Sequence, residues 1–191
     1  MAMIQNYFDF SNLTKIVTDE AKLWGNGSVK ETDSKAAPML TKYWNNVGIS
    51  KYTSANFASD TWQNEHPWSS VYVSWVINQV DGSFPKSAAH RNYTKSALDN
   101  RNAKRGSWNL FSLSRERKKI KAQVGDVLVG PRSGSYTNSH GDLVWKVSGG
   151  KAYLAGGNLS NTNKTDMTVS LNSDGSYPKN PSNYLVVLKK I

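Results

Sequence analysis

The spacing of apolar residues changes near the middle of the chain, and this change does most to restrict the fold. In the first half, apolar side chains recur at helical spacing over residues 13–24, and Gly25-Asn26-Gly27 would end that helix. We expect further helices over residues 36–46, 67–82 and 86–99. The first half of the sequence therefore predicts a group of helices.

Short β-branched or aromatic runs replace this pattern in the second half, with Gly, Ser and Asn between them. We expect strands over residues 124–129, 142–147, 152–154 and 184–188. The sequence Ser148-Gly149-Gly150-Lys151 predicts a hairpin turn, because adjacent glycines accept the positive φ that such turns need. Helices followed by an antiparallel sheet predict the α+β class, with N-terminal helices packed on a C-terminal sheet.

The composition predicts one globular domain over residues 1–191. Seven Trp, nine Tyr and five Phe supply large apolar side chains for a core. The absence of cysteine excludes a disulfide framework, a thiolate zinc site and a catalytic thiol, so any nucleophile must be an oxygen. The longest apolar runs fall well short of the roughly 20 residues of a spanning helix, so we expect no membrane span.

The net charge of +10 is concentrated in one stretch of the chain, Lys86–Lys121, which we call the basic segment. It holds eleven Lys and Arg residues and only Asp99 and Glu116 as acids, a local net charge of +9. Such a segment attracts polyanions, which include nucleic acid, anionic lipid and acidic envelope polymers, although it could also be a solvated surface. Neither an RNA-reading motif nor zinc-finger spacing is present, so we expect no sequence-specific nucleic-acid binding.

Three segments carry the candidate chemistry: residues 67–75 (PWSSVYVSW) at a helix start, 124–129 (VGDVLV) in a strand, and 139–144 (SHGDLV) entering the next strand. In this order and spacing, the chain resembles the papain-like cell-wall amidase and peptidase superfamily of the NlpC and CHAP type. In that superfamily a nucleophilic Cys opens the helix. The chain is most similar to a bacterial and phage branch with Ser in its place, which also has a Phe-Pro-x-Ser-Ala-x-His segment (here Phe84–His90) and a later Gly-Gly-Asn.

The resemblance implies a papain-like peptidoglycan hydrolase, either a stem-peptide endopeptidase or an N-acetylmuramoyl-L-alanine amidase. It implies that Ser69 is the nucleophile, that His140 takes its proton and that Asn158 orients the imidazole. Three further residues are expected to contact the substrate: Trp68, His90 and Asp142. No metal-ligand spacing such as HExxH is present, so we expect neither a metal nor another cofactor.

A serine in place of cysteine leaves three explanations open: a natural serine variant, an engineered Cys-to-Ser exchange, or a fold kept for binding alone. A catalytically inactive module that binds wall fragments or a protein partner is therefore the main alternative to the enzyme. A basic nucleic-acid-binding protein is a second alternative. At the level of single residues, Ser69 could be only a helix N-cap and Asn158 only a turn residue.

Peptidoglycan is the expected partner, and the basic segment would hold the protein on anionic wall polymers in a salt-dependent way. The first residues lack a basic region followed by an apolar stretch, so we expect no secretory signal peptide. We then expect synthesis in the cytoplasm and delivery to the periplasm or cell wall by a phage or a secretion system. An immunity or delivery protein would be a further partner.

Overall fold

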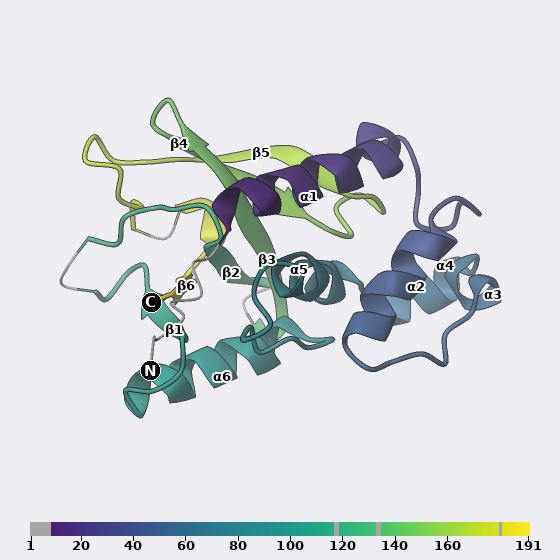
Figure 1. Ribbon diagram of the computed structural model, residues 1–191, viewed down its shortest axis with the longest axis horizontal. Coiled ribbons are helices and arrows are strands. Elements are labelled where there is room, and N and C mark those ends of the chain that lie inside the picture. The colour runs from purple at the N-terminus through teal and green to yellow at the C-terminus, as the bar shows by residue number, and fades with distance from the viewer. Residues whose placement is uncertain (1–8, 117–118, 133–134, 180) are drawn as a thin grey trace, which may run out of the picture.

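The computed structural model describes residues 9–116, 119–132, 135–179 and 181–191 (Figure 1). The helical elements come first along the chain: α1 (Phe10–Leu23), η1 (Gly25–Gly27), α2 (Ala37–Asn46), α3 (Ser54–Phe57), α4 (Asp60–Glu65), α5 (Ser69–Asn78) and α6 (His90–Asn102). The strands follow, with one short 3-10 helix among them: β1 (Trp108–Ser112), β2 (Val127–Arg132), β3 (Ser135–Ser148), β4 (Lys151–Gly156), β5 (Lys164–Ser170), η2 (Pro181–Asn183) and β6 (Val186–Lys190). The predicted α+β class is confirmed.

The strands form one antiparallel sheet in the order β1-β6-β2-β3-β4-β5. Strands β3 and β4 form the predicted hairpin, in which Ser148 pairs with Lys151. The two turn residues, Gly149 and Gly150, have φ angles of 57° and 72°. Both values lie in the left-handed region, which explains why two adjacent glycines favour this turn.

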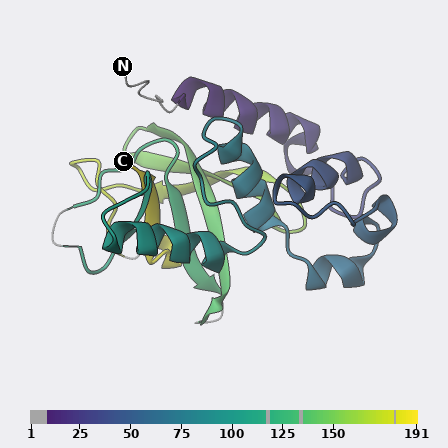
Figure 2. The same ribbon diagram turned by 60° about the horizontal axis from the view of Figure 1, so that its bottom comes forward.

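The two faces of the sheet pack against different parts of the chain. Because side chains alternate along a strand, Val127 and Val129 of β2 join a core beneath the helices, whereas Leu128 joins a smaller core on the opposite face. Helices α1, α5 and α6 cover the first face (Figures 1 and 2). The second face is covered by side chains from two later segments: Leu113, Ile120, Ala122, Leu171 and Tyr177.

Helix α5 lies at the centre of the helical layer, between α2 and strand β3 (Figure 1). Eight of its ten residues are buried, which explains why its sequence is apolar on every side. Its first turn is therefore enclosed by other elements rather than exposed at the surface. The structure in this way fixes the position of Ser69, the first residue of the helix.

Several elements differ from the sequence prediction. Helices α3 and α4 have only four and six residues, too few to show a helical period, and the two edge strands of the sheet, β1 and β5, lie outside the predicted strands. Helix α6 begins at His90 rather than at Lys86, because Ala89 has an extended backbone. Strand β2 begins at Val127, since Asp126 accepts a hydrogen bond from the Gln123 N–H in a turn. None of the helices in the described residues is long and apolar enough to cross a membrane.

Candidate active site

Ser69 opens helix α5, as the sequence predicts, and Trp68 fixes the start of that helix. The Trp68 ring stacks on Trp24 with 4.7 Å between centroids, and its Nε1 donates to Glu31 Oε2 at 2.7 Å. Trp68 is fully buried, so it does not form the substrate wall that the resemblance implies. It is instead an anchor for the backbone at Ser69.

The hydrogen-bond partner of Ser69 is His90, and the two residues begin α5 and α6 respectively. Ser69 Oγ lies 2.7 Å from His90 Nε2. Both side chains are nearly buried, with 3% and 5% of their surface exposed. The structure therefore pairs Ser69 with His90 rather than with the expected His140.

The other ring nitrogen of His90 faces a buried tyrosine one helical turn away. The Tyr93 hydroxyl is hydrogen-bonded to His90 Nδ1 and also interacts with the hydroxyl of Ser70. Ser70 Oγ donates to the carbonyl oxygen of Ser87 at 2.8 Å, and a carbonyl can only accept. Ser70 therefore has lone pairs left for the Tyr93 proton.

One arrangement of protons satisfies all of these groups. With the Tyr93 proton directed to Ser70, Tyr93 accepts from His90 Nδ1–H, and the proton of neutral His90 lies on Nδ1. His90 Nε2 is then free to accept the proton of Ser69 Oγ. This is the tautomer that a general base for Ser69 requires.

The surroundings of His90 keep its imidazole neutral. Burial, and then coulombic interactions with His140 and Arg132, hold the pKa of His90 well below its usual value. A neutral imidazole retains the lone pair on Nε2 at neutral pH. The electrostatics therefore agree with the hydrogen-bond directions.

Gly141 of strand β3 allows the sheet to approach this pair closely. A Cβ at position 141 would lie 2.8 Å from His90 Nδ1 and 3.0 Å from the Tyr93 hydroxyl, which is closer than side-chain carbons approach. Glycine is therefore needed here for close approach rather than for an unusual φ. The strand and helix α6 together restrict the movement of the His90 ring.

His140 belongs to a second, adjacent network on the sheet. Arg132 donates to His140 Nδ1 at 2.9 Å, and His140 Nε2 lies 3.0 Å from Asp142 Oδ1. Because arginine only donates, His140 carries its proton on Nε2 and directs it to Asp142. Both ring nitrogens of His140 thus have partners other than Ser69. Its ring centre lies 5.6 Å from that of His90.

The orienting residue of His140 is Asp142 rather than Asn158. Asp142 is fully buried, bonds His140 through one oxygen and accepts from the Tyr184 hydroxyl through the other. It is therefore not exposed for the substrate contact that the resemblance implies. Asn158 lies in the turn after β4 with φ of 56°, and none of its hydrogen bonds within the described residues reaches His140. The structure therefore does not bring Asn158 into contact with His140.

Two small pockets meet at this site. One, of about 110 Å³, is lined by Ser69, Ser70, His90, Arg91 and Arg132, among others. The second, of about 250 Å³, contains His140, Leu159, Tyr184 and again Arg132. Ser69 thus has access to a pocket, and Arg132 stands where the two pockets adjoin.

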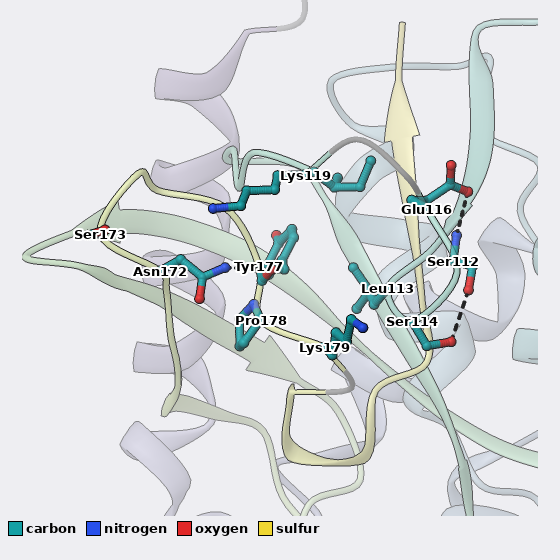
Figure 3. Close-up of a pocket in the computed structure, with 11 residues that line it drawn as sticks. Ser112, Leu113, Ser114, Glu116, Lys119, Asn172, Ser173, Tyr177, Pro178 and Lys179 are labelled. Carbon is teal, nitrogen blue, oxygen red and sulfur yellow. Dashed lines mark hydrogen bonds between the residues drawn. The ribbon is translucent and has the colours of Figure 1, made fainter.

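A larger hollow of about 440 Å³ lies elsewhere, lined by residues 112–114, 116 and 119–120 on one side and by residues 172–173 and 177–179 on the other (Figure 3). In its lining, the hydroxyl groups of Ser112 and Ser114 lie 3.3 Å apart. The lining contains no histidine that could take a proton from either serine. Glu116, which also lines it, is held by Arg101 of α6. The hollow offers no base for a nucleophile, so the smaller site at Ser69 is the better candidate for chemistry.

The described residues contain no group of three or more His, Asp or Glu side chains that could hold a metal ion. Three members of the site are absent from the sequence prediction: Tyr93, Arg132 and Tyr184. The sequence does contain an indication of Tyr93, because it lies three residues after His90 and the two side chains therefore share one face of the same helix. Arg132 reaches the site through the pairing of β2 with the next strand, β3. Tyr184 precedes β6 and reaches the site through the pairing of β6 with β2, which lies far away in the sequence and which no local pattern reveals.

Comparison with known proteins places the chain in a family. The model of the family described as "Uncharacterized protein conserved in bacteria (DUF2272)" matches residues 34–177, about three quarters of the chain. This range includes Ser69, His90 and His140 and ends before Tyr184. Neither a curated protein nor a solved structure matches the sequence. The chain therefore belongs to the bacterial family DUF2272.

Proposed function

We propose that this protein is a serine hydrolase of peptide or amide bonds in peptidoglycan, with Ser69 as nucleophile and His90 as general base. The observation that carries the proposal is the 2.7 Å hydrogen bond between Ser69 Oγ and His90 Nε2 at the edge of a pocket. A serine hydroxyl is a weak nucleophile that needs an adjacent base, and this separation suits proton transfer. The resemblance to cell-wall amidases and peptidases supports the substrate.

The reaction would proceed in two halves. Ser69 Oγ attacks the carbonyl carbon of the scissile amide while its proton moves to His90 Nε2. Backbone N–H groups at the start of α5, which have no partner within the helix, would stabilise the oxyanion. The C–N bond then breaks as His90 gives its proton to the leaving amine, and water hydrolyses the Ser69 ester with His90 again accepting a proton.

Attachment to the wall would come from the basic segment. Five of its cations are exposed and have no ion pair within the described residues: Lys86, Arg91, Lys104, Arg105 and Arg115. Others are paired, since Lys119 and Lys121 both contact Asp174. The unpaired cations supply a charge that anionic wall polymers would bind at low salt.

Charge reversal tests this attachment. Four cations in one short stretch, Arg115, Arg117, Lys118 and Lys119, are changed to Glu, which lowers the net charge from +10 to +2. Arg117 and Lys118 lie outside the described residues. We expect binding to intact walls at low salt to fall sharply, while turnover of a soluble muropeptide changes little. Salt-dependent retention on duplex DNA, compared with wall polymer, tests the nucleic-acid alternative.

A binding module without catalysis is the second candidate, because only 3% of the Ser69 surface is exposed. In such a module, the hydrogen bond to His90 would serve only to hold the starts of α5 and α6 together. The pocket would then hold a wall fragment without cleaving it.

Mass spectrometry of fragments released from purified peptidoglycan separates the two candidates. We expect the wild type to release fragments, Ser69→Ala and His90→Gln to release none, and Ser69→Cys to retain or raise the activity. Ser96→Ala, which removes an exposed serine on α6, is the matched control. Release that is equal in the wild type and Ser69→Ala would exclude the enzyme. Release by the Cys variant alone would favour the binding module.

A further inference from the structure

The pocket at Ser69 has an unbalanced charge. Its lining contains two guanidinium groups, Arg91 and Arg132, and no carboxylate. The adjoining pocket also lacks an acidic residue in its lining. Neither arginine has an ion pair with Asp or Glu in the part of the chain that the structure describes. A ligand that fills this space would therefore meet uncompensated positive charge.

Arg132 is held in a fixed position. It donates to His140 Nδ1 at 2.9 Å, His140 is held by Asp142, and Asp142 accepts from the Tyr184 hydroxyl. The chain of contacts ends in a carboxylate that is fully buried. This hydrogen bond uses one of the five N–H groups of the guanidinium, which leaves donors on Arg132 for a ligand.

The location of Arg132 restricts which group it can bind. It lines the pocket of about 110 Å³ that also contains Ser69 and His90, and this volume holds only a few heavy atoms. An anionic group on Arg132 would thus lie a few bonds from a carbonyl carbon at Ser69. The planar fork of a guanidinium matches a carboxylate through two parallel hydrogen bonds.

We propose that Arg132 binds a free carboxylate of the substrate, located within about one residue of the scissile amide. This inference rests on the proposed function, because it assigns the substrate class of the same site. The substrates are then acidic peptides or amides, and the same compounds with that carboxylate converted to a carboxamide are poor substrates. Arg91, exposed at the rim of the pocket, adds positive charge without a fixed geometry.

A pair of soluble muropeptides tests the proposal, one with free carboxylates and one with those carboxylates converted to carboxamides. We expect the wild type to prefer the free acid by about 10- to 100-fold in kcat/KM, mainly through KM, because a charge-assisted pair is lost in the amide. Arg132→Gln should abolish this preference, and Arg132→Lys should retain part of it. Lys35→Gln, which removes an exposed cation outside both pockets and outside the basic segment, should keep the full preference.

Calorimetric binding of both muropeptides to Ser69→Ala protein provides a readout that does not need turnover. Tighter binding of the free acid, lost in the Ser69→Ala, Arg132→Gln double variant, would support the proposal even if no hydrolysis occurs. Turnover or binding that is equal for the acid and the amide would overturn the proposal while leaving the proposed hydrolase intact. A total absence of wild-type turnover would instead count against the hydrolase, and the binding comparison would still decide the role of Arg132.

Discussion

Replacing Gly141 with alanine should disturb the candidate active site through packing alone. The new Cβ would lie 2.8 Å from His90 Nδ1 and 3.0 Å from the Tyr93 hydroxyl. His90 would have to move by roughly 0.7 Å to restore an ordinary contact of about 3.5 Å. Both side chains are buried and hydrogen-bonded, so this displacement is not absorbed by a flexible chain end. We expect a loss of about 1–3 kcal/mol in the free energy of unfolding.

The same substitution should lower hydrolysis by roughly 100-fold, since a misplacement near 1 Å of a catalytic group has effects of that size. Urea unfolding, muropeptide turnover and the NMR signals of the His90 ring measure the three consequences. Gly82→Ala is the matched control, because nothing lies within 4 Å of a Cβ at that position. If Gly141→Ala matched Gly82→Ala in stability and left the His90 signals unshifted, the packing argument would be wrong.

Three further predictions concern buried polar groups. Tyr93→Phe should destabilise the fold by about 1–3 kcal/mol and lower the hydrolytic activity, because His90 Nδ1–H loses its hydrogen-bond acceptor. Urea unfolding measures the stability, and muropeptide turnover measures the activity. Folded His90 has a pKa well below 6.5, so the unfolded chain binds its proton first as the pH falls. The stability of the wild type relative to His90→Gln should therefore fall as the pH drops below about 6.5, and an unchanged difference would contradict this. Burial, opposed by Lys189, raises the pKa of Asp126 to about 6 in the folded protein. The unfolded chain therefore loses this proton at a lower pH than the folded protein does. The stability of the wild type relative to Asp126→Asn should fall as the pH rises from about 4 to 6, which urea titrations measure.

The sequence predicts the scaffold of the site better than its contacts. Helix α5 and the position of Ser69 follow from Pro67 and from an apolar run at helical spacing, which are local features. The β3–β4 hairpin follows from two adjacent glycines. The two edge strands are missed: β5 is mostly polar and lacks an apolar run, whereas β1 contains Trp108, Leu110 and Phe111 but has only five residues.

The choice between the histidines could not be made from local patterns. His90 and His140 lie 21 and 71 residues after Ser69, and the packing of α6 against β3 decides which of them reaches it. The alternation of side chains along β3 does place His140 and Asp142 on one side of the strand, and the structure confirms that pair. The resemblance favours Asn158 instead, and a turn with positive φ carries that residue elsewhere.

Labelling with a fluorophosphonate reagent, with the modified residue mapped by mass spectrometry, tests the central claim most directly, because the reagent reacts with a serine that an adjacent base activates. We predict one adduct on Ser69, absent in Ser69→Ala, strongly reduced in His90→Gln and much less reduced in His140→Gln. The absence of an adduct on Ser69, or equal labelling rates in the wild type and His90→Gln, would contradict a Ser69–His90 catalytic pair.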